Sequence, residues 1–382
     1  MGNIKPLTVR DQIAKYPVIQ GGMGVGISLS SLAGAVAKAG GIGIISTAQI
    51  GFRDPNFLKD PMGANMRAIR EELKKARAIA PKGIIGFNIM VATRNYAQYV
   101  KEAIKAGADI IISGAGLPVD LPGYLEEAKQ IAAKAGETVR TKIAPIVSTA
   151  KSAMVICRLW DRKYKQAPDL LVIEGPLAGG HLGFSREQLA QYGADTPNVP
   201  DTYDQAAYDQ EIRDIIKVAK QFEEKYGRPI PVVIAGGIYT HDDVDHAIGE
   251  LGADGVQVAT RFVTTVECDA PMCYKQAYID AKQEDIVITK SPVGMPGRAI
   301  RNVFLDNAAG KKAKIDHCYQ CLEHCDPKNI PYCITKALSN AAEGDLDHGL
   351  LFCGSNAYRA NRIETVNQVI EDLFGIITES CP

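Results

Sequence analysis

Short apolar runs alternate with amphipathic segments along the first two thirds of the chain. Continuous runs rich in Val, Ile and Ala predict strands buried on both faces at residues 16–20, 42–47, 83–90, 109–114, 142–148, 170–175, 231–237 and 255–260. Apolar residues at helical spacing predict helices at 30–38, 64–80, 95–106, 123–135, 150–160, 203–226 and 242–251. Eight such strands, the first seven each followed by a helix, predict an α/β fold, a TIM-type (β/α)8 barrel with a smaller appended C-terminal region.

The repeat divides the chain into three predicted parts. Residues 1–265 form the barrel, with a long loop at 184–202 after the sixth strand. Such a loop at the active end of a barrel is typical of a lid or a substrate wall. Residues 266–310 form a substrate-side extension, and residues 311–382 form a Cys-rich helical segment that packs on the barrel.

Composition narrows the classes of partner. Apolar residues make up 46% and charged residues 23% of the chain, and the formal net charge is -1. This balance gives no electrostatic case for a nucleic acid or an anionic membrane. No apolar segment has the length of a signal sequence or a membrane span, so a cytoplasmic protein is expected. The expected partner is a small-molecule substrate, and a homodimer is left open.

The sixth strand leads into the main candidate for chemistry. The apolar run at 170–175 is followed by a glycine-rich turn that carries His181. Histidine titrates near neutral pH, so His181 beside a pocket at this end of the barrel is a candidate proton acceptor. The alternative is a structural histidine bound to backbone at the end of a strand.

The remaining strand ends favour an anion and a planar ring. Glycines Gly236 and Gly237 follow the seventh strand, and Ala259 and Thr260 follow the eighth, where barrels bind phosphate through backbone N–H groups. The alternative for each is a tight turn. No lysine ends a strand, which argues against Schiff-base chemistry, and Glu174 is the only acidic residue at a strand end, too few for magnesium. A ring could lie on the flat surface formed by Gly21, Gly22, Met23, Asn88 and 113–116.

These motifs resemble the nitronate monooxygenases, formerly called 2-nitropropane dioxygenases, and the related flavin-dependent enoyl-acyl-carrier-protein reductases. The resemblance rests on residues 17–24, 86–90, 178–183, 235–238 and 257–262, in the same order, and covers about residues 5–305. It implies a barrel that holds non-covalent FMN, with His181 as catalytic base. It further implies FMN contacts at Gly22, Met23, Asn88, Gly180, Gly236, Gly237, Gln257, Ala259 and Thr260.

The activity implied is oxidation of alkyl nitronates with O2 to a carbonyl compound and nitrite. The alternative is an enoyl-thioester reductase that uses FMN with NAD(P)H as electron donor. A third possibility, from another class, is a phosphosugar isomerase or a flavin-binding protein without turnover. Two positions depart from the family pattern: Leu177 stands where several relatives have an acidic residue, and residues 353–357 replace an Ala-Gly-Gln-like turn.

The cysteines crowd the last quarter of the chain. Six of the nine lie between Cys318 and Cys381. The spacing of Cys318, Cys321, Cys325 and Cys333 could wrap an iron–sulfur cluster, or hold zinc with His317 or His324 as an alternative ligand. The opposing interpretation is a set of ordinary free cysteines, since buried thiols are common core residues.

Overall fold

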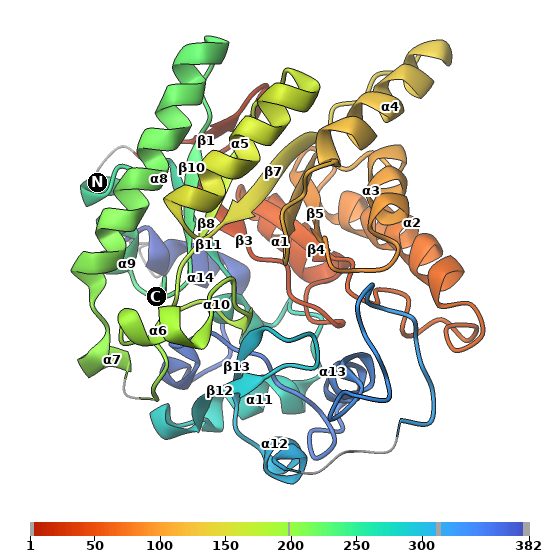
Figure 1. The fold of residues 1–382 in the computed structure, drawn as a ribbon, viewed down its shortest axis with the longest axis vertical. Helices are drawn as coiled ribbons and strands as arrows, with labels where there is room; N and C mark the ends of the chain where they lie inside the picture. Colours follow the sequence, from red (N-terminus) through yellow and green to blue (C-terminus); the bar gives the residue numbers. More distant parts are fainter. Residues whose placement is uncertain (1–3, 198, 311–314, 377–382) are drawn as a thin grey trace, which may run out of the picture.

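The computed structural model describes residues 4–197, 199–310 and 315–376 and closes eight parallel strands into a barrel (Figure 1). The strands are β3 (Val18–Gln20), β4 (Ile42–Ser46), β5 (Ile84–Met90), β6 (Ile110–Gly114), β7 (Lys142–Val147), β8 (Leu171–Glu174), β10 (Val232–Ala235) and β11 (Gly255–Val258). They follow chain order around the barrel, which is closed where β11 pairs with β3. The predicted TIM-type fold is confirmed.

Branched side chains fill the interior of the barrel, and a hairpin covers one end of it. Ile19, Ile44 and Val172 lie in one buried cluster with Leu7 and Val9. The last two belong to an antiparallel hairpin of β1 (Leu7–Val9) and β2 (Gln12–Ala14), which the sequence pattern did not predict. Filling the interior in this way makes the barrel a packed core and leaves the opposite, C-terminal face for a site.

The outer ring consists of the predicted helices and of one short helix, Thr260–Val263, that the sequence pattern did not predict. They are α1 (Ser30–Ala39), α2 (Pro61–Ile79), α3 (Tyr96–Lys105), α4 (Leu121–Lys134), α5 (Ala150–Tyr164), α8 (Gln205–Tyr226), α9 (His241–Asp245) with a π-helical continuation at His246–Glu250, and α10 (Thr260–Val263). Side chains cap several starts, as when Thr149 Oγ1 accepts a hydrogen bond from Ser152 N. Each helix turns a buried stripe toward the strands.

The last place in the ring is taken by a helix from the C-terminal part of the chain. Helix α14 (Val366–Leu373) packs against α1, α9 and α10. Its Val366, Val369, Ile370 and Leu373 are buried. The predicted division of the chain at residues 265 and 310 stays a prediction.

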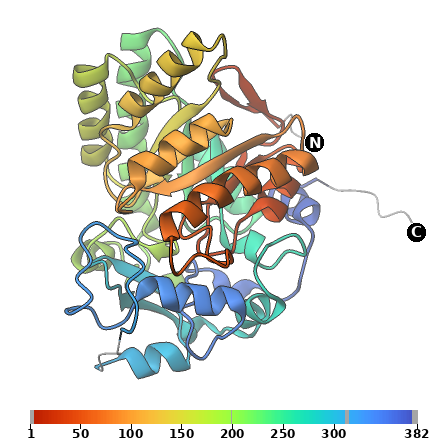
Figure 2. The ribbon, with the colours of Figure 1, turned by 90° about the vertical axis from the view of Figure 1, so that its right-hand side faces the viewer.

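The chain between α10 and α14 forms a cap on one end of the barrel (Figure 2). Its elements are α11 (Met272–Asp280), a 3-10 turn at Gln283–Asp285, β12 (Ile286–Lys290), β13 (Pro296–Ile300), α12 (Val303–Ala308), α13 (Ile334–Glu343) and a 3-10 turn at Ala357–Arg359. The cap has its own apolar cluster, which includes Ala299, Tyr332, Ile334 and Leu350.

Two features differ from the expected loop after the sixth strand. Residues Gly180–His181 form a short strand, β9, which pairs with β13 in a three-stranded antiparallel sheet. The expectation that 184–202 is a plain loop is wrong, because the segment contains α6 (Arg186–Gln191) and α7 (Val199–Thr202). The Ser185 side chain caps α6 by accepting from Gln188 N, a local start signal that the loop interpretation overlooked.

In the described ranges, no helix is both long enough and apolar enough to cross a bilayer.

Candidate active site

One cavity at the C-terminal ends of the barrel strands contains His181 and all nine residues expected to contact FMN. It is lined by Gly22, Met23, Asn88, Gly180, His181, Gly236, Gly237, Gln257, Ala259 and Thr260. The cap adds Val293, Leu322, Ile334, Leu338 and Phe352. The space amounts to about 1660 Å³, including the part open to solvent. Residues of the barrel and of the cap therefore face one continuous space.

One end of this cavity presents unpaired backbone donors. Gly236 (φ +93°) and Gly237 (φ +88°) adopt left-handed conformations, and a Cβ on Gly236 would come within 2.9 Å of Ala178 N. Within the described residues, no protein acceptor pairs with the N–H groups of Gly236, Gly237 or Thr260. Free N–H groups on two adjacent turns suit a phosphate group.

The neighbouring wall is flat and carries unpaired amides. A Cβ on Gly22 would overlap Asn88 Cβ, so only glycine lets these two strand ends approach so closely. The side-chain amides of Asn88 and Gln257 line the cavity, and in the described part of the chain neither has a hydrogen-bond partner. Amides that can both donate and accept match the polar edge of a flavin ring. The residues present therefore fit FMN.

His181 is held from two sides. Its Nε2 lies 2.6 Å from Ser291 Oγ, and its ring meets the Phe352 ring edge to face, with centroids 4.9 Å apart. Burial lowers the pKa of His181 to about 4. The imidazole is therefore neutral at pH 7, and when Nε2–H donates to Ser291 the lone pair on Nδ1 is free to accept a proton.

A buried arginine fixes the turn that leads to His181. Arg298 on β13 is only 1% exposed. Its guanidinium donates to the carbonyl oxygens of Pro176 (2.9 Å), Ala178 (2.5 Å) and Ala194 (2.6 Å). Burial lowers the pKa of Arg298 to about 10, so the group remains charged at neutral pH. One cation thus organises the whole turn between β8 and β9.

Glu174 is a second titratable group in the cavity wall. Its Oε1 accepts a hydrogen bond from Gly183 N at 3.0 Å. Burial raises the pKa of Glu174 to about 7, well above the ordinary range for a carboxyl group. In the sequence, Glu174 is the only acidic residue at a strand end, a position that by itself assigns it no role.

Residues 353–357, which depart from the family pattern, lie against the two turns at Gly236–Gly237 and Thr260. Gly354 N donates to Thr260 Oγ1 at 3.2 Å, and Asn356 Nδ2 donates to Gly237 O at 2.7 Å. Cys353 and Gly354 also line the cavity. These contacts give the departure from the family pattern a defined place in the site.

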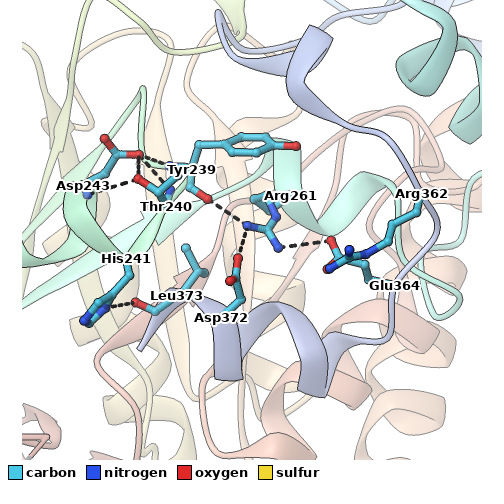
Figure 3. Close-up of polar contacts among 9 residues, drawn as sticks. All are labelled: Tyr239, Thr240, His241, Asp243, Arg261, Arg362, Glu364, Asp372 and Leu373. Atoms are coloured by element: carbon cyan, nitrogen blue, oxygen red, sulfur yellow. Dashed lines mark hydrogen bonds and ion pairs between the residues drawn. The ribbon is translucent and has the colours of Figure 1, made fainter. Parts of the chain in front are cut away.

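A polar network behind the same turns ties them to helix α14 (Figure 3). Arg261, which follows Thr260, donates to Tyr239 O and to Asp372, and forms a second ion pair with Glu364 at 3.1 Å. His241 Nδ1 lies 2.9 Å from Leu373 O. Breaking such a buried pair from one side is costly, so the network holds the C-terminal helix against the strand ends.

The four cysteines proposed as cluster ligands differ in their exposure to solvent. Cys318 is exposed, Cys325 and Cys333 are half-buried, and Cys321 lines the main cavity. Burial raises the pKa of Cys321 to about 11. Among the residues that the structure describes, no group of three or more His, Cys, Asp or Glu side chains is arranged to hold a metal ion. The cluster and zinc interpretations gain no support from this geometry; Cys381 lies outside the described residues.

Sequence reasoning missed three residues that position the predicted base: Ser291, Arg298 and Phe352. All three come from the cap, more than 100 positions after His181. The only local signal was the Ser-Pro pair at 291–292, which follows the β-branched run at 286–289. Nothing in it points to His181.

Comparisons with known proteins agree with this geometry. A family model described as nitronate monooxygenase matches residues 7–375. A probable nitronate monooxygenase of Staphylococcus saprophyticus subsp. saprophyticus is 26% identical over 305 residues, which cover 76% of this chain and 77% of that protein. The structure of FabK from Thermotoga maritima aligns with a TM-score of 0.67 and 25% identity, over 95% and 92% of the two chains. The nitroalkane oxidase of Streptomyces ansochromogenes shares the fold, with a TM-score of 0.64 and 19% identity over 95% of each chain.

Proposed function

Since the chain belongs to the nitronate monooxygenase family and is a flavin-dependent oxidoreductase, we propose that it oxidises alkyl nitronates with O2 to carbonyl compounds and nitrite. One observation carries the proposal: a neutral, half-buried imidazole shares one cavity with two turns of backbone N–H groups and two side-chain amides that have no hydrogen-bond partner among the described residues. No other cofactor is needed to account for these groups.

FMN is the cofactor that the residues fit. The backbones of Gly236, Gly237 and Thr260 would hold its phosphate, and Asn88 and Gln257 would meet the polar edge of its ring beside Gly22. When bound, FMN supplies the electron transfer and oxygen chemistry, which no side chain of the cavity can supply. The protein supplies position, proton transfer and exclusion of water.

His181 provides the base for neutral substrates. A nitroalkane must lose the proton on the carbon beside the nitro group before it becomes a nitronate. His181 accepts that proton at Nδ1 while Ser291 orients the ring through Nε2, and the electron pair stays on the substrate. A substrate supplied as nitronate bypasses this step.

Two measurements test the proposal. The purified protein should be yellow, with absorption near 450 nm, and should form nitrite from propane-2-nitronate in air. His181→Asn should retain the flavin and lose at least 100-fold in turnover of neutral 2-nitropropane. A colourless protein would instead favour a phosphosugar isomerase, and a yellow protein inactive on every nitro compound would favour a flavin-binding protein.

A second candidate function, NAD(P)H-dependent enoyl-thioester reduction, is favoured by the lining of the cap. Leu322, Ile334 and Leu338 of the cap, together with Met90 of strand β5, extend the cavity with apolar surface beyond what a small nitronate needs. An acyl chain would fit such a wall. Fast anaerobic bleaching of the flavin by NADH or NADPH, followed by reoxidation with an enoyl thioester, would replace the first proposal with this one.

A further inference from the structure

Glu174 lies where two cavities meet. Beside the main cavity is a second hollow, the outer cavity, walled by residues 146–149, 182–185 and 294–296. The two cavities share Ala115, Ile146, Glu174 and His181. A ligand at this junction therefore faces one carboxyl group and one imidazole.

One oxygen of this carboxyl group is available to a ligand. Gly183 N occupies Oε1, whereas in the described part of the chain no group bonds Oε2 and no cation pairs with the side chain. The neighbouring titratable groups are His181 on β9 and Tyr208 on α8. The Tyr208 hydroxyl donates to the Glu174 backbone carbonyl at 3.0 Å and leaves the carboxyl group free.

The lining lacks any positive side chain that could receive an anion. No Lys or Arg is among the described residues that line either cavity, and Glu174 is the one carboxyl group among them. A nitronate carries its negative charge on the two nitro oxygens. An ionised carboxylate at the junction would repel these oxygens, whereas a protonated carboxylic acid would donate a hydrogen bond to them.

We propose that Glu174, in its protonated form, binds the nitro oxygens of the anionic substrate through its free carboxyl oxygen. The inference rests on the proposed function and extends it, because it assigns the group that distinguishes an anionic nitronate from a neutral nitroalkane. Burial keeps the pKa of Glu174 at about 7, so the donor is present below neutral pH and is lost as pH rises through 7.

The test is the pH dependence of KM. For the wild-type enzyme, the KM for propane-2-nitronate should rise about 20-fold between pH 6.5 and 8.5, while kcat changes little. Glu174→Gln keeps an N–H donor without a charge, so its KM should be flat over this range. Glu174→Ala has no donor, and its KM should be high throughout. Glu187→Gln, a change at an exposed residue of α6 outside both cavities, should behave as wild type.

A binding measurement separates affinity from turnover. Nitrite carries the same O–N–O group and does not react as a substrate, so its Kd can be followed by the change in flavin absorbance. This Kd should weaken with pH in the wild type and stay constant in Glu174→Gln. An active enzyme whose Glu174→Gln variant keeps the wild-type pH dependence would overturn the inference. No nitronate turnover by any variant at any pH would overturn the proposed function itself.

Discussion

Ser291 Oγ lies 2.6 Å from Nε2 of His181, although 110 positions separate the two residues in the chain. The contact joins the barrel turn to the cap, because Ser291 directly follows β12 and His181 lies on β9. The orientation of the predicted base is therefore set by a segment outside the barrel repeat.

Ser291→Ala should weaken catalysis without releasing the flavin. A lost hydrogen bond of this kind is worth about 1–1.5 kcal/mol, which corresponds to roughly a tenfold fall in kcat for neutral nitroalkanes. Nitrite release and the flavin spectrum measure the two effects. Ser291→Thr retains the hydroxyl group and should restore most of the rate; a Thr variant as slow as Ala would contradict the positioning role.

Arg298→Lys should loosen the turn that carries His181. Lysine keeps the charge but cannot reproduce the fork that reaches three carbonyl oxygens, so two buried acceptors lose partners. We expect a loss of about 2–3 kcal/mol in the free energy of unfolding and a fall in kcat. Arg186→Lys is the matched control, because Arg186 is exposed and, among the described residues, donates to Ile288 O alone; it should cost less than about 1 kcal/mol.

Gly236→Ala should impair flavin binding. The new Cβ would strain the left-handed backbone and crowd Ala178 N, displacing the N–H groups that face the phosphate position. We expect the Kd for FMN to rise at least tenfold, measured by fluorescence titration of the flavin-free protein. Gly227→Ala carries the same kind of left-handed backbone (φ +60°) with open space around it, and its FMN affinity should equal that of the wild type.

Glu364→Gln should destabilise the attachment of helix α14. It removes one of the two carboxylate charges that face the buried Arg261 guanidinium, and Asp372 supplies the other, so we expect a loss of about 1–3 kcal/mol in the free energy of unfolding. Thermal unfolding should show the loss directly. Asp306→Asn breaks an exposed pair with Arg301, whose side chains are 54% and 60% exposed, and should change stability by less than about 1 kcal/mol.

Glu174→Gln should also alter the pH dependence of stability. The pKa of Glu174 is raised by burial to about 7 in the folded chain, so the folded state holds its proton after the unfolded state has lost it. The stabilisation is complete below pH 4.5 and is lost as pH rises through 7. Between pH 4.5 and 8, the free energy of unfolding of the variant should therefore rise relative to that of the wild type by up to about 3 kcal/mol. Urea midpoints of the flavin-free proteins at both pH values measure this; an unchanged difference would contradict it.

The barrel was predictable because each of its strands has a clear pattern in the sequence. Runs such as Ile42–Ser46 are apolar without interruption and end at small residues, and each is followed by a helical pattern. The hairpin β1–β2 was missed because three-residue strands alternate too briefly to stand out. Strand β9 was missed for a related reason: it is only two residues long, Gly180–His181, and it is defined by its pairing with the distant strand β13.

The part of the site formed by the barrel strand ends was predictable, and the part formed by the cap was not. Gly236, Gly237 and Thr260 follow barrel strands, so topology alone brings them together. Ser291 and Phe352 reach His181, and Arg298 reaches the turn before it, through the fold of the cap, where the chain follows no repeat. Their contacts depend on tertiary packing over long sequence separations, which local patterns do not encode.

Helix α14 fills the last place in the ring, yet the entire cap lies between it and strand β11. During synthesis, the ribosome must therefore release the cap before the seam between α1 and α9 can be covered. Until then the nascent chain exposes the apolar groove that Val366, Val369, Ile370 and Leu373 later occupy. A messenger truncated shortly before codon 366 would yield a chain with all eight barrel strands but an open, aggregation-prone side.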